Sequence, residues 1–403
     1  MGKHYFLSLA SQFRLRDVLR HTFSFGTQKD SEVLISHLAK RYNTSTEKVA
    51  LYATGRSALA RAIELLVPPD SEVIITSLTC HAVVESVVAA GCTPVFADVN
   101  KETLHYGVKE LRACYKEHHD AKAIIVQNNL GYPVDMKSIE KFCDLHDLII
   151  IEDLAHCAGV YYPDGREAGT VGDAAILSFG KGKSIDTIAG GALILNNADE
   201  DHIIDAPSRR PSLLSSIRAR LYPLFGWLAR LLSYLHLSGI FMRILLFLRL
   251  IQRSADAELD LTRRCTHWQS KLALRQLKRL PKNRPPIRDF FFVKDRELVL
   301  KKLQRKGFYF NDVWYDVPVA PVRYFADVNF PSDECPIATE LAAQIINFPT
   351  HYSKISLRPA RKIIKEYIIK EEDENPQVTK KSPEKPSKTN DNGLTPRKKE
   401  SQK

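Results

Sequence analysis

The chain has 403 residues, 44% of them hydrophobic, which is the composition of a globular protein long enough to bury a sizeable core. Its seven cysteines are scattered without a C-x-x-C pair, which argues against a disulfide framework or a zinc site and predicts a reducing, cytoplasmic compartment. The formal charge of +11 fits an anionic partner, but no nucleic-acid recognition motif accompanies the basic residues, so no nucleic-acid role is expected.

Residues 1–46 are expected to form an N-terminal helical segment without a signal peptide, because their apolar runs are short and interrupted. From residue 47, apolar strand-like stretches alternate with amphipathic helical ones. Strands are expected at 48–53, 71–77, 93–99, 121–127, 147–154, 173–180 and 191–196, and helices at 57–66, 82–91, 109–119 and 136–146. Strands that are apolar throughout and alternate with helices predict a parallel sheet covered on both faces, here a large α/β domain over 47–205.

Residues 206–254 differ from the rest of the chain, because they hold eight arginines and no Asp, Glu or Lys among many apolar residues. Arginine interrupts the apolar run too often for a bilayer span. The spacing predicts two short basic amphipathic helices, at 224–235 and 240–251, that suit an anionic membrane surface. A hydrophobic hairpin buried in a dimer interface or over the substrate site, and arginines that hold a substrate diphosphate, stay open as alternatives.

Residues 255–370 are expected to form a smaller C-terminal α/β domain. It should contain a helix over 266–280, strands within 307–325 and a late helix over 358–370. Residues 371–403 mix charge with Pro, Ser and Asn and lack apolar side chains, so they are expected to be a disordered tail.

Polar residues stand at the carboxyl ends of the predicted strands, where open parallel sheets bind ligands. They fall in 53–57 (ATGRS), 77–81 (SLTCH), 127–129 (QNN), 152–156 (EDLAH) and 178–183 (SFGKGK). The Gly-Lys-Ser at 182–184 lacks the spacing and the following helix of a nucleotide phosphate loop. Each cluster alone is also explained by an ordinary helix cap, a solvated acid or a core histidine. Together they offer a lysine, a carboxylate and phosphate donors, which are the groups that pyridoxal phosphate requires.

Several motifs carry a family resemblance at matched spacing. They are GRSAL at 55–59, GCTPVFADVN at 91–100, IEDLAH at 151–156, Ser178-Phe179 followed by Lys183, QSKLALRQLKRL at 269–280 and INFPTHY at 346–352. The chain thereby resembles the DegT/DnrJ/EryC1/StrS sugar aminotransferases, closely over 45–205 and more loosely over 262–370. The resemblance implies fold type I of the pyridoxal-phosphate enzymes, with a mostly parallel central sheet covered by helices and a smaller C-terminal α/β domain.

The resemblance also implies roles for single residues. Lys183 would be the catalytic Schiff-base lysine, Asp153 the catalytic contact to the pyridinium nitrogen, and His156 the contact on the ring-hydroxyl side. The other candidate cofactor contacts are Gly55, Arg56, Ser57 and Ser178 for the phosphate, Asn128 where many members have His, and Cys80 or His81 where members have a stacking aromatic residue. Arg264, in a Thr-Arg-Arg that replaces the family's Asn-Tyr-Arg, is a candidate substrate or partner-subunit contact. No metal site is expected.

The function implied is a transaminase that moves an amino group from an amino acid, glutamate, to a nucleotide- or lipid-linked keto-sugar in surface polysaccharide or glycan biosynthesis. A homodimer with shared sites is expected, in the cytoplasm, with peripheral attachment to an anionic membrane through 206–254. The departures at Cys80 and Thr262 leave a catalytically silent binding or regulatory relative open. The retained Lys183 argues against the family's deoxygenating branch, which has His there.

Overall fold

The computed structural model describes residues 5–6, 15–196, 203–233, 235, 237–253, 256–282, 284–309, 313–350 and 358–369. The predicted tail at 371–403 lies outside the described residues. The domain boundaries placed near residues 47, 205, 254 and 370 stay predictions.

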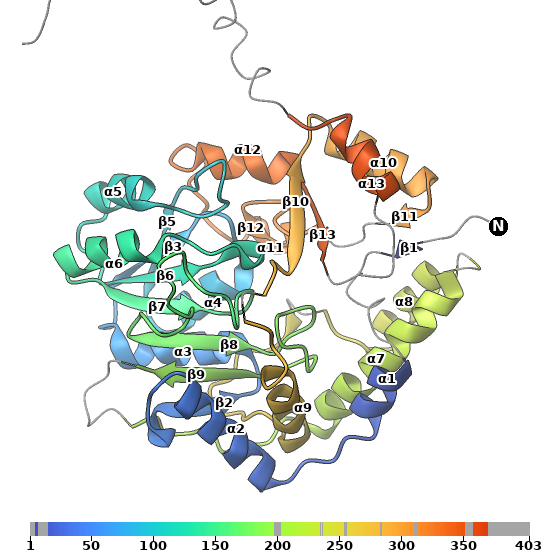
Figure 1. Ribbon diagram of the computed structural model, residues 1–403, viewed down its shortest axis with the longest axis horizontal. Helices are drawn as coiled ribbons and strands as arrows, with labels where there is room; N and C mark the ends of the chain where they lie inside the picture. Colours follow the sequence, from blue (N-terminus) through green and yellow to red (C-terminus); the bar gives the residue numbers. More distant parts are fainter. Residues whose placement is uncertain are drawn as a thin grey trace, which may run out of the picture. The chain divides into compact units, whose positions relative to one another are not determined.

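A seven-stranded sheet forms the scaffold of the candidate site (Figure 1). Its strands, in spatial order, are β2 (Val49–Tyr52), β9 (Gly191–Leu195), β8 (Ala174–Ser178), β7 (Ile149–Asp153), β6 (Ala123–Gln127), β3 (Glu72–Thr76) and β5 (Thr93–Ala97). Strand β9 is antiparallel to both neighbours, and the other pairs are parallel. The predicted mostly parallel α/β fold is therefore confirmed.

Successive side chains along each strand enter two different cores, one on each face of the sheet. In β6, Ile124 and Val126 belong to one core, and Ala123 and Ile125 to the other. Helices α2 (Gln28–Arg41), α5 (Val108–Glu117), α6 (Met136–Leu145) and α9 (His267–Leu277) cover the first face. Helices α3 (Gly55–Leu66), α4 (His81–Ala89) and α12 (Pro336–Gln344) cover the second. The continuous apolar runs in the strands follow from this double burial.

The C-terminal residues form a separate two-stranded sheet with its own apolar cluster. Strand β10 (Arg288–Phe292) pairs antiparallel with β13 (Ile345–Pro349), beside α10 (Arg296–Arg305) and α13 (Arg358–Lys365). Two short pairings also involve this half: β12 (Val319–Ala320) with β4 (Thr79–Cys80), and β11 (Phe308–Tyr309) with β1 (Tyr5–Phe6). The β4–β12 pairing joins the two halves of the chain directly at Cys80, which the sequence analysis names as a candidate cofactor contact.

The prediction of strands through 307–325 is wrong for much of that stretch. Only β11 and β12 are strands there, the described residues between them form turns, and α11 (Val322–Phe325) is helical. Pro318 and Pro321 flank β12, and a proline cannot donate to a strand ladder.

The basic apolar segment folds as α7 (Leu213–Ser233) and α8 (Ser238–Phe247), which lie beside α1 (Leu15–Thr22) (Figure 1). The first helix starts well before the predicted residue 224 and contains Pro223. Its inner side packs with Val18 of α1 and Trp268 of α9. No helix among the described residues is long and apolar enough to cross a membrane.

A buried carboxylate fixes the loop that follows β7. The Glu152 side chain is fully buried, and each of its oxygens accepts two hydrogen bonds. Oε2 accepts from the Tyr162 hydroxyl at 2.6 Å and the Gly169 N–H at 2.7 Å, and Oε1 from the N–H groups of Val171 at 2.8 Å and Gly172 at 2.6 Å. Burial raises the pKa of Glu152, while these four donors favour its ionised form.

We predict that Glu152→Gln lowers the free energy of unfolding by about 3 kcal/mol, because an amide nitrogen at either position would face two donors. Chemical denaturation checks this, with Glu117→Gln as the control, since the Glu117 side chain is 69% exposed. Equal stability of the two variants would show that the loop does not depend on this carboxylate.

Candidate active site

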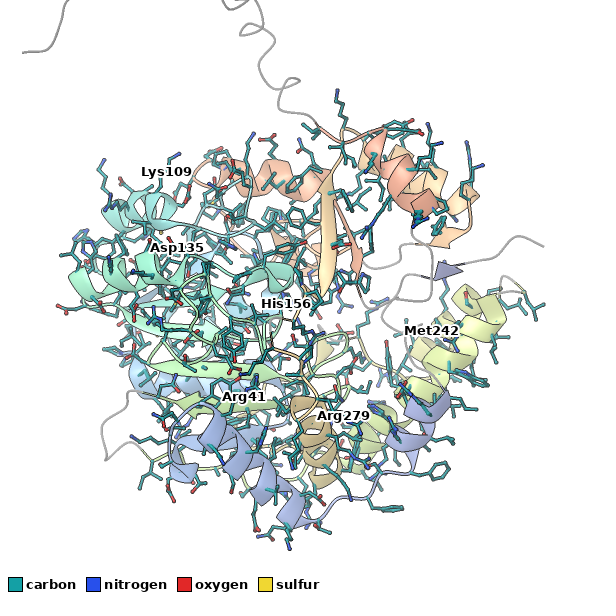
Figure 2. All side chains as sticks on the ribbon, viewed as in Figure 1. Arg41, Lys109, Asp135, His156, Met242 and Arg279 are labelled. Carbon is teal, nitrogen blue, oxygen red and sulfur yellow. The ribbon has the colours of Figure 1, made fainter. Side chains whose placement is uncertain are left out.

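Lys183 is presented by the turn between β8 and β9. The Lys183 N–H donates to the Gly180 carbonyl at 3.2 Å, and the Gly182 N–H donates to Asp186 Oδ2 at 2.8 Å. Gly182 has φ +72°, a conformation that glycine adopts without strain. The turn brings Lys183 Nζ to 2.8 Å from His156 Nε2. His156 itself lies in the loop after β7 and is labelled in Figure 2.

The hydrogen bonds of His156 fix the protonation state of Lys183. His156 Nδ1 accepts from the Leu130 N–H at 3.2 Å, so this nitrogen carries no proton. A neutral imidazole then carries its proton on Nε2, which donates to Lys183 Nζ, and only an uncharged amine can accept it. Burial, together with the nearby charge of Arg288, holds the pKa of His156 well below its usual range.

The surroundings of Lys183 favour the same neutral state. Burial lowers its pKa, and the guanidinium groups of Arg288 and Arg56 act in the same direction, against the opposing pull of Cys80 and Asp153. A neutral amine is the nucleophilic form of lysine. The arrangement can therefore form a covalent bond with a carbonyl compound.

An aromatic lid from the C-terminal half covers this pair. The Trp314 ring stacks on His156, with centroids 4.9 Å apart and planes at 25°, and lies 4.9 Å from Lys183 Nζ. Arg288, from β10, places its guanidinium 4.5 Å from the Trp314 ring centroid. These contacts hold the imidazole and indole rings against each other.

Asn347 on β13 holds the lid in place. Its Oδ1 accepts from the Trp314 N–H at 3.1 Å and from Arg288 Nε at 2.7 Å, and its Nδ2 donates to the Trp314 carbonyl at 2.6 Å. Trp314, Arg288 and Asn347 were all missed by the sequence predictions. The only signals available were a polar Asn inside the INFPTHY motif and an Arg at the start of an aromatic strand.

Asp153 ends β7 with a buried carboxylate. Its Oδ1 accepts from the Ala155 N–H at 2.9 Å, and its Oδ2 accepts a longer bond, 3.4 Å, from Gln127 Nε2. The Gln127 amide is oriented by the Thr79 hydroxyl, which donates to Gln127 Oε1 at 2.6 Å. Burial raises the pKa of Asp153 against the opposing effect of these hydrogen bonds. The weakly bonded Oδ2 can accept a further donor.

The start of α3 forms an anion-binding end of the site. A Cβ built on Gly55 would lie 2.7 Å from the Ser178 Cβ, so glycine is required for this close approach. The first turn of α3 carries no acidic residue, and its Ser57 N–H donates to the Thr54 hydroxyl at 3.1 Å, so what the helix start offers a phosphate is the positive end of the helix dipole. Arg56 pairs with Glu85 at 2.5 Å, and Ser57 is buried with its Oγ accepting from the Asp260 N–H at 3.2 Å.

Of the other predicted residues, Asn128, His81 and Arg264 contact groups other than the Lys183 amine, whereas Cys80 lies near enough to act on the pKa of that amine. Asn128 donates to Cys157 Sγ at 3.3 Å and accepts from the Val134 N–H at 3.0 Å, so its amide supports the end of β6. His81 stacks on Tyr324, with centroids 4.7 Å apart. The Arg264 guanidinium lies 3.0 Å from His267 Nε2. Cys80 is half-buried and belongs to the β4–β12 pairing.

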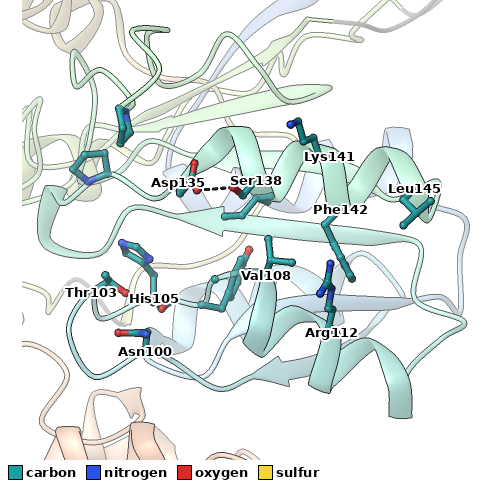
Figure 3. A pocket seen from close by; sticks show the side chains of 15 residues that line it. Asn100, Thr103, His105, Val108, Arg112, Asp135, Ser138, Lys141, Phe142 and Leu145 are labelled. Atoms are coloured by element: carbon teal, nitrogen blue, oxygen red, sulfur yellow. Dashed lines mark hydrogen bonds between the residues drawn. The ribbon is translucent and has the colours of Figure 1, made fainter. Parts of the chain in front are cut away.

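A pocket of about 700 Å³ lies at α5 and α6 (Figure 3). Asp135, Lys141 and His105 line it, and none of the predicted site residues does. Burial lowers the pKa of His105 to about 4, so its ring is neutral. The Ser138 hydroxyl in its lining donates to Asp135 Oδ2 at 2.5 Å, and the pocket shares no lining residue with the Lys183 site.

The fold and motifs match known proteins. The model of the DegT/DnrJ/EryC1/StrS aminotransferase family matches residues 38–210. A GDP-perosamine synthase from Vibrio cholerae is 33% identical over 154 residues, which are 38% of this chain and 40% of that relative. The chain thus spans about two fifths of that relative's length. A GDP-perosamine synthase from Caulobacter vibrioides is 26% identical over 310 residues, 74% of this chain and 79% of the relative.

A solved structure from Streptococcus pneumoniae, described as a sugar aminotransferase in its PLP form, has a TM-score of 0.58 at 18% identity and covers 91% of this chain and 97% of that one. The same protein has been solved in a PMP form. At this identity the likeness shows the fold.

We predict that His156→Phe raises the pKa of Lys183 by about one unit, because the ring keeps its shape but the hydrogen bond to the neutral amine is lost. Competitive acetylation of the ligand-free protein across pH, with peptide mapping, measures this pKa. His105→Phe, at another buried histidine, should leave it unchanged. A Lys183 pKa equal to that of the exposed Lys116 in the unsubstituted protein would contradict the neutral-amine assignment.

Proposed function

We propose that the chain is a pyridoxal-phosphate-dependent aminotransferase of the DegT/DnrJ/EryC1/StrS family that acts on a keto-sugar, because the model of that family matches residues 38–210. The observation that carries the proposal is the neutral Lys183 amine held by His156 beside the buried Asp153. Glutamate is the proposed amino donor, and a nucleotide- or lipid-linked keto-sugar is the proposed acceptor. Sugar products appear in the names of the relatives, which are GDP-perosamine synthases.

The residues of the site fit pyridoxal phosphate. Lys183 is a nucleophile for its aldehyde, Asp153 offers a carboxylate for the ring nitrogen, and the Gly55 approach with the acid-free start of α3 suits its phosphate. When bound, the cofactor supplies an electron sink for the carbanion that forms when the amino acid loses its α-proton.

The chain's own groups supply binding, orientation and proton transfer. Lys183 Nζ would hold the cofactor and would take and return the α-proton as a general base. His156 Nε2 orients this amine, and Trp314 shields it from water. This constellation favours an active enzyme over a catalytically silent relative, which would not require a neutral lysine.

A homodimer is proposed on the family resemblance, with Arg264 as a candidate contact to the partner. Arg264 and Arg209 lie on neighbouring backbone segments joined by the hydrogen bond from the Arg264 N–H to the Arg209 carbonyl at 2.9 Å. This places two arginines at the edge of β2, where the isolated bridge from Tyr52 to Arg264 also lies.

Attachment to an anionic membrane is proposed for the outer surface of α1, α7, α8 and the residues that follow α1 and α8, here called the apolar face. Phe247 is 85% exposed and Leu213 is 78% exposed. Other exposed members are Leu15, Leu19, Phe23, Leu214, Ile217, Leu231, Ile240, Ile244, Leu248 and Leu250. Arg220 fixes α7 to the end of α1 by donating to the carbonyls of Thr22 and Ser24, at 3.2 and 2.8 Å.

The chemistry of this surface suits anionic lipid. An exposed apolar patch of this kind marks an interaction site, and the eight arginines of 206–254, without any acid there, favour an anionic partner. Embedding the apolar side chains in the lipid boundary would remove them from water.

We predict that borohydride reduction of the cofactor-loaded protein followed by peptide mapping tags Lys183. Lys183→Ala should abolish transamination, and Asp153→Ala should reduce kcat by orders of magnitude, because the ring nitrogen loses its carboxylate. Lys181 is the internal control, since burial lowers its pKa to about 8 and makes it the competing nucleophile in the same turn. A tag on Lys181, or none despite bound cofactor, would refute the assignment.

We predict that the protein co-sediments with phosphatidylserine vesicles at low salt and less so at high salt. The double variant Ile244→Ser with Phe247→Ser should bind at least about tenfold more weakly, because each lost side chain removes about 1.5–3 kcal/mol of burial. Leu145→Ser, at a 75% exposed apolar residue on α6, is the matched control. Sedimentation without vesicles serves as the second readout: dimer loss in the double variant, or no vesicle binding by the full chain, contradicts the membrane proposal.

A further inference from the structure

A second, strongly basic pocket of about 340 Å³ lies at the end of α8. Arg218, Arg249 and Arg253 line it together with Leu246 and Ile251. The one acid in its lining, Asp256, forms an ion pair with Arg323 and accepts from the Tyr324 hydroxyl at 2.7 Å, so its charge is already countered. The pocket therefore presents an excess of positive charge.

The three arginines are not committed to partners in the described part of the chain. None of them forms an ion pair there, and Arg218 Nε is buried without a hydrogen-bond acceptor. Buried donors in folded proteins normally have an acceptor, so this N–H can donate to a ligand oxygen. Guanidinium groups clustered in this way suit oxyanions such as phosphate, whose oxygens they can bind in pairs.

The pocket adjoins the Lys183 turn. Lys181 Nζ donates to the carbonyl of Gln252, which lines the pocket, and lies 4.1 Å from the Tyr222 ring centroid of α7. Asp256, which also lines the pocket, accepts a hydrogen bond from the Tyr324 hydroxyl. The Tyr324 ring in turn stacks on His81, the residue after Cys80. A ligand with its phosphate in this pocket can extend toward the candidate active site.

The surroundings of the pocket favour a lipid over a nucleoside. Its described lining contains no aromatic side chain on which a base could stack. Phe247, Leu248 and Leu250 lie in the same segment as the lining Leu246, Arg249 and Ile251, and they are 85%, 55% and 38% exposed. The pocket thus lies against the apolar face.

We propose that this pocket binds the diphosphate of a lipid-linked sugar, with the lipid chain along the apolar face and the sugar directed toward Lys183. The proposal rests on the proposed aminotransferase function and narrows its acceptor to a carrier in the membrane. Lys181 lies two residues before Lys183, and its hydrogen bond to the Gln252 carbonyl would keep the pocket wall in a fixed position relative to the turn that carries Lys183.

Calorimetry with the cofactor-loaded full chain tests this proposal with four probes: farnesyl diphosphate, UDP, inorganic pyrophosphate and farnesol. Farnesyl diphosphate should bind at least tenfold more tightly than each of the other three. The double variant Arg249→Gln with Arg253→Gln should lose at least tenfold of that affinity, and both residues are exposed, so folding should persist. Arg243→Gln, at an exposed arginine of α8 outside the pocket, removes one charge as a control and should change the affinity less than twofold.

Four results would overturn the proposal: UDP binding as tightly as farnesyl diphosphate, equal affinity for pyrophosphate, equal affinity for farnesol, or an equal loss per charge in Arg243→Gln. Cofactor absorbance and the Lys183 tag, measured on the same samples, separate the two proposals. An intact tag without farnesyl diphosphate binding rejects the pocket alone, and retained binding without any cofactor rejects the aminotransferase.

Discussion

The hydrogen bond between His156 and Lys183 is the constraint on which the candidate site depends. It has a direction only because the Leu130 N–H occupies the other imidazole nitrogen. Three segments distant in sequence must therefore be placed together: the end of β6, the loop after β7 and the turn after β8. The parallel order of these neighbouring strands brings their carboxyl ends to one edge, and the charge state of one amine follows from that topology.

The adjacent acids of β7 show how strand alternation separates structure from chemistry. Glu152 faces one side of the sheet, where four hydrogen-bond donors from the following loop offset the cost of burying its charge. Asp153 faces the other side and keeps an oxygen with only one long hydrogen bond. The Tyr162 hydroxyl connects the two regions, because it donates to Glu152 and accepts from Asn128 Nδ2 at 3.4 Å. Asn128 thus contributes to the order of the loop that carries His156.

The sequence predicted the parts of the site that are encoded locally. Strands ending in polar residues, a glycine turn around Lys183 and the α3 cap can each be inferred from a few neighbouring residues. The lid could not, because Arg288, Trp314 and Asn347 come from three segments whose contact depends on the β10–β13 pairing. The contribution of α1 to the apolar face was missed for the same reason, since Arg220 joins helices almost 200 residues apart in the chain. The stretch 307–325 was misjudged because its aromatic residues resemble strand residues while its prolines prevent a ladder.

The apolar face and the arginine pocket impose opposite requirements on one short segment. Close to Arg249, the side chains of Phe247, Leu248 and Leu250 are apolar and exposed, whereas the charged side chains of Arg249 and Arg253 line the pocket. Neither water nor a dry protein interface satisfies both the apolar and the charged groups. A protein partner that buried Phe247 would also have to desolvate the neighbouring arginines, which costs several kcal/mol per unpaired charge. An anionic lipid boundary meets both requirements, because acyl chains accept the apolar groups while phosphates at the same depth accept the guanidinium groups. The same argument applies to a diphosphate-linked lipid, which carries an apolar chain and a strong anion in one molecule and so matches the segment better than a soluble nucleotide does.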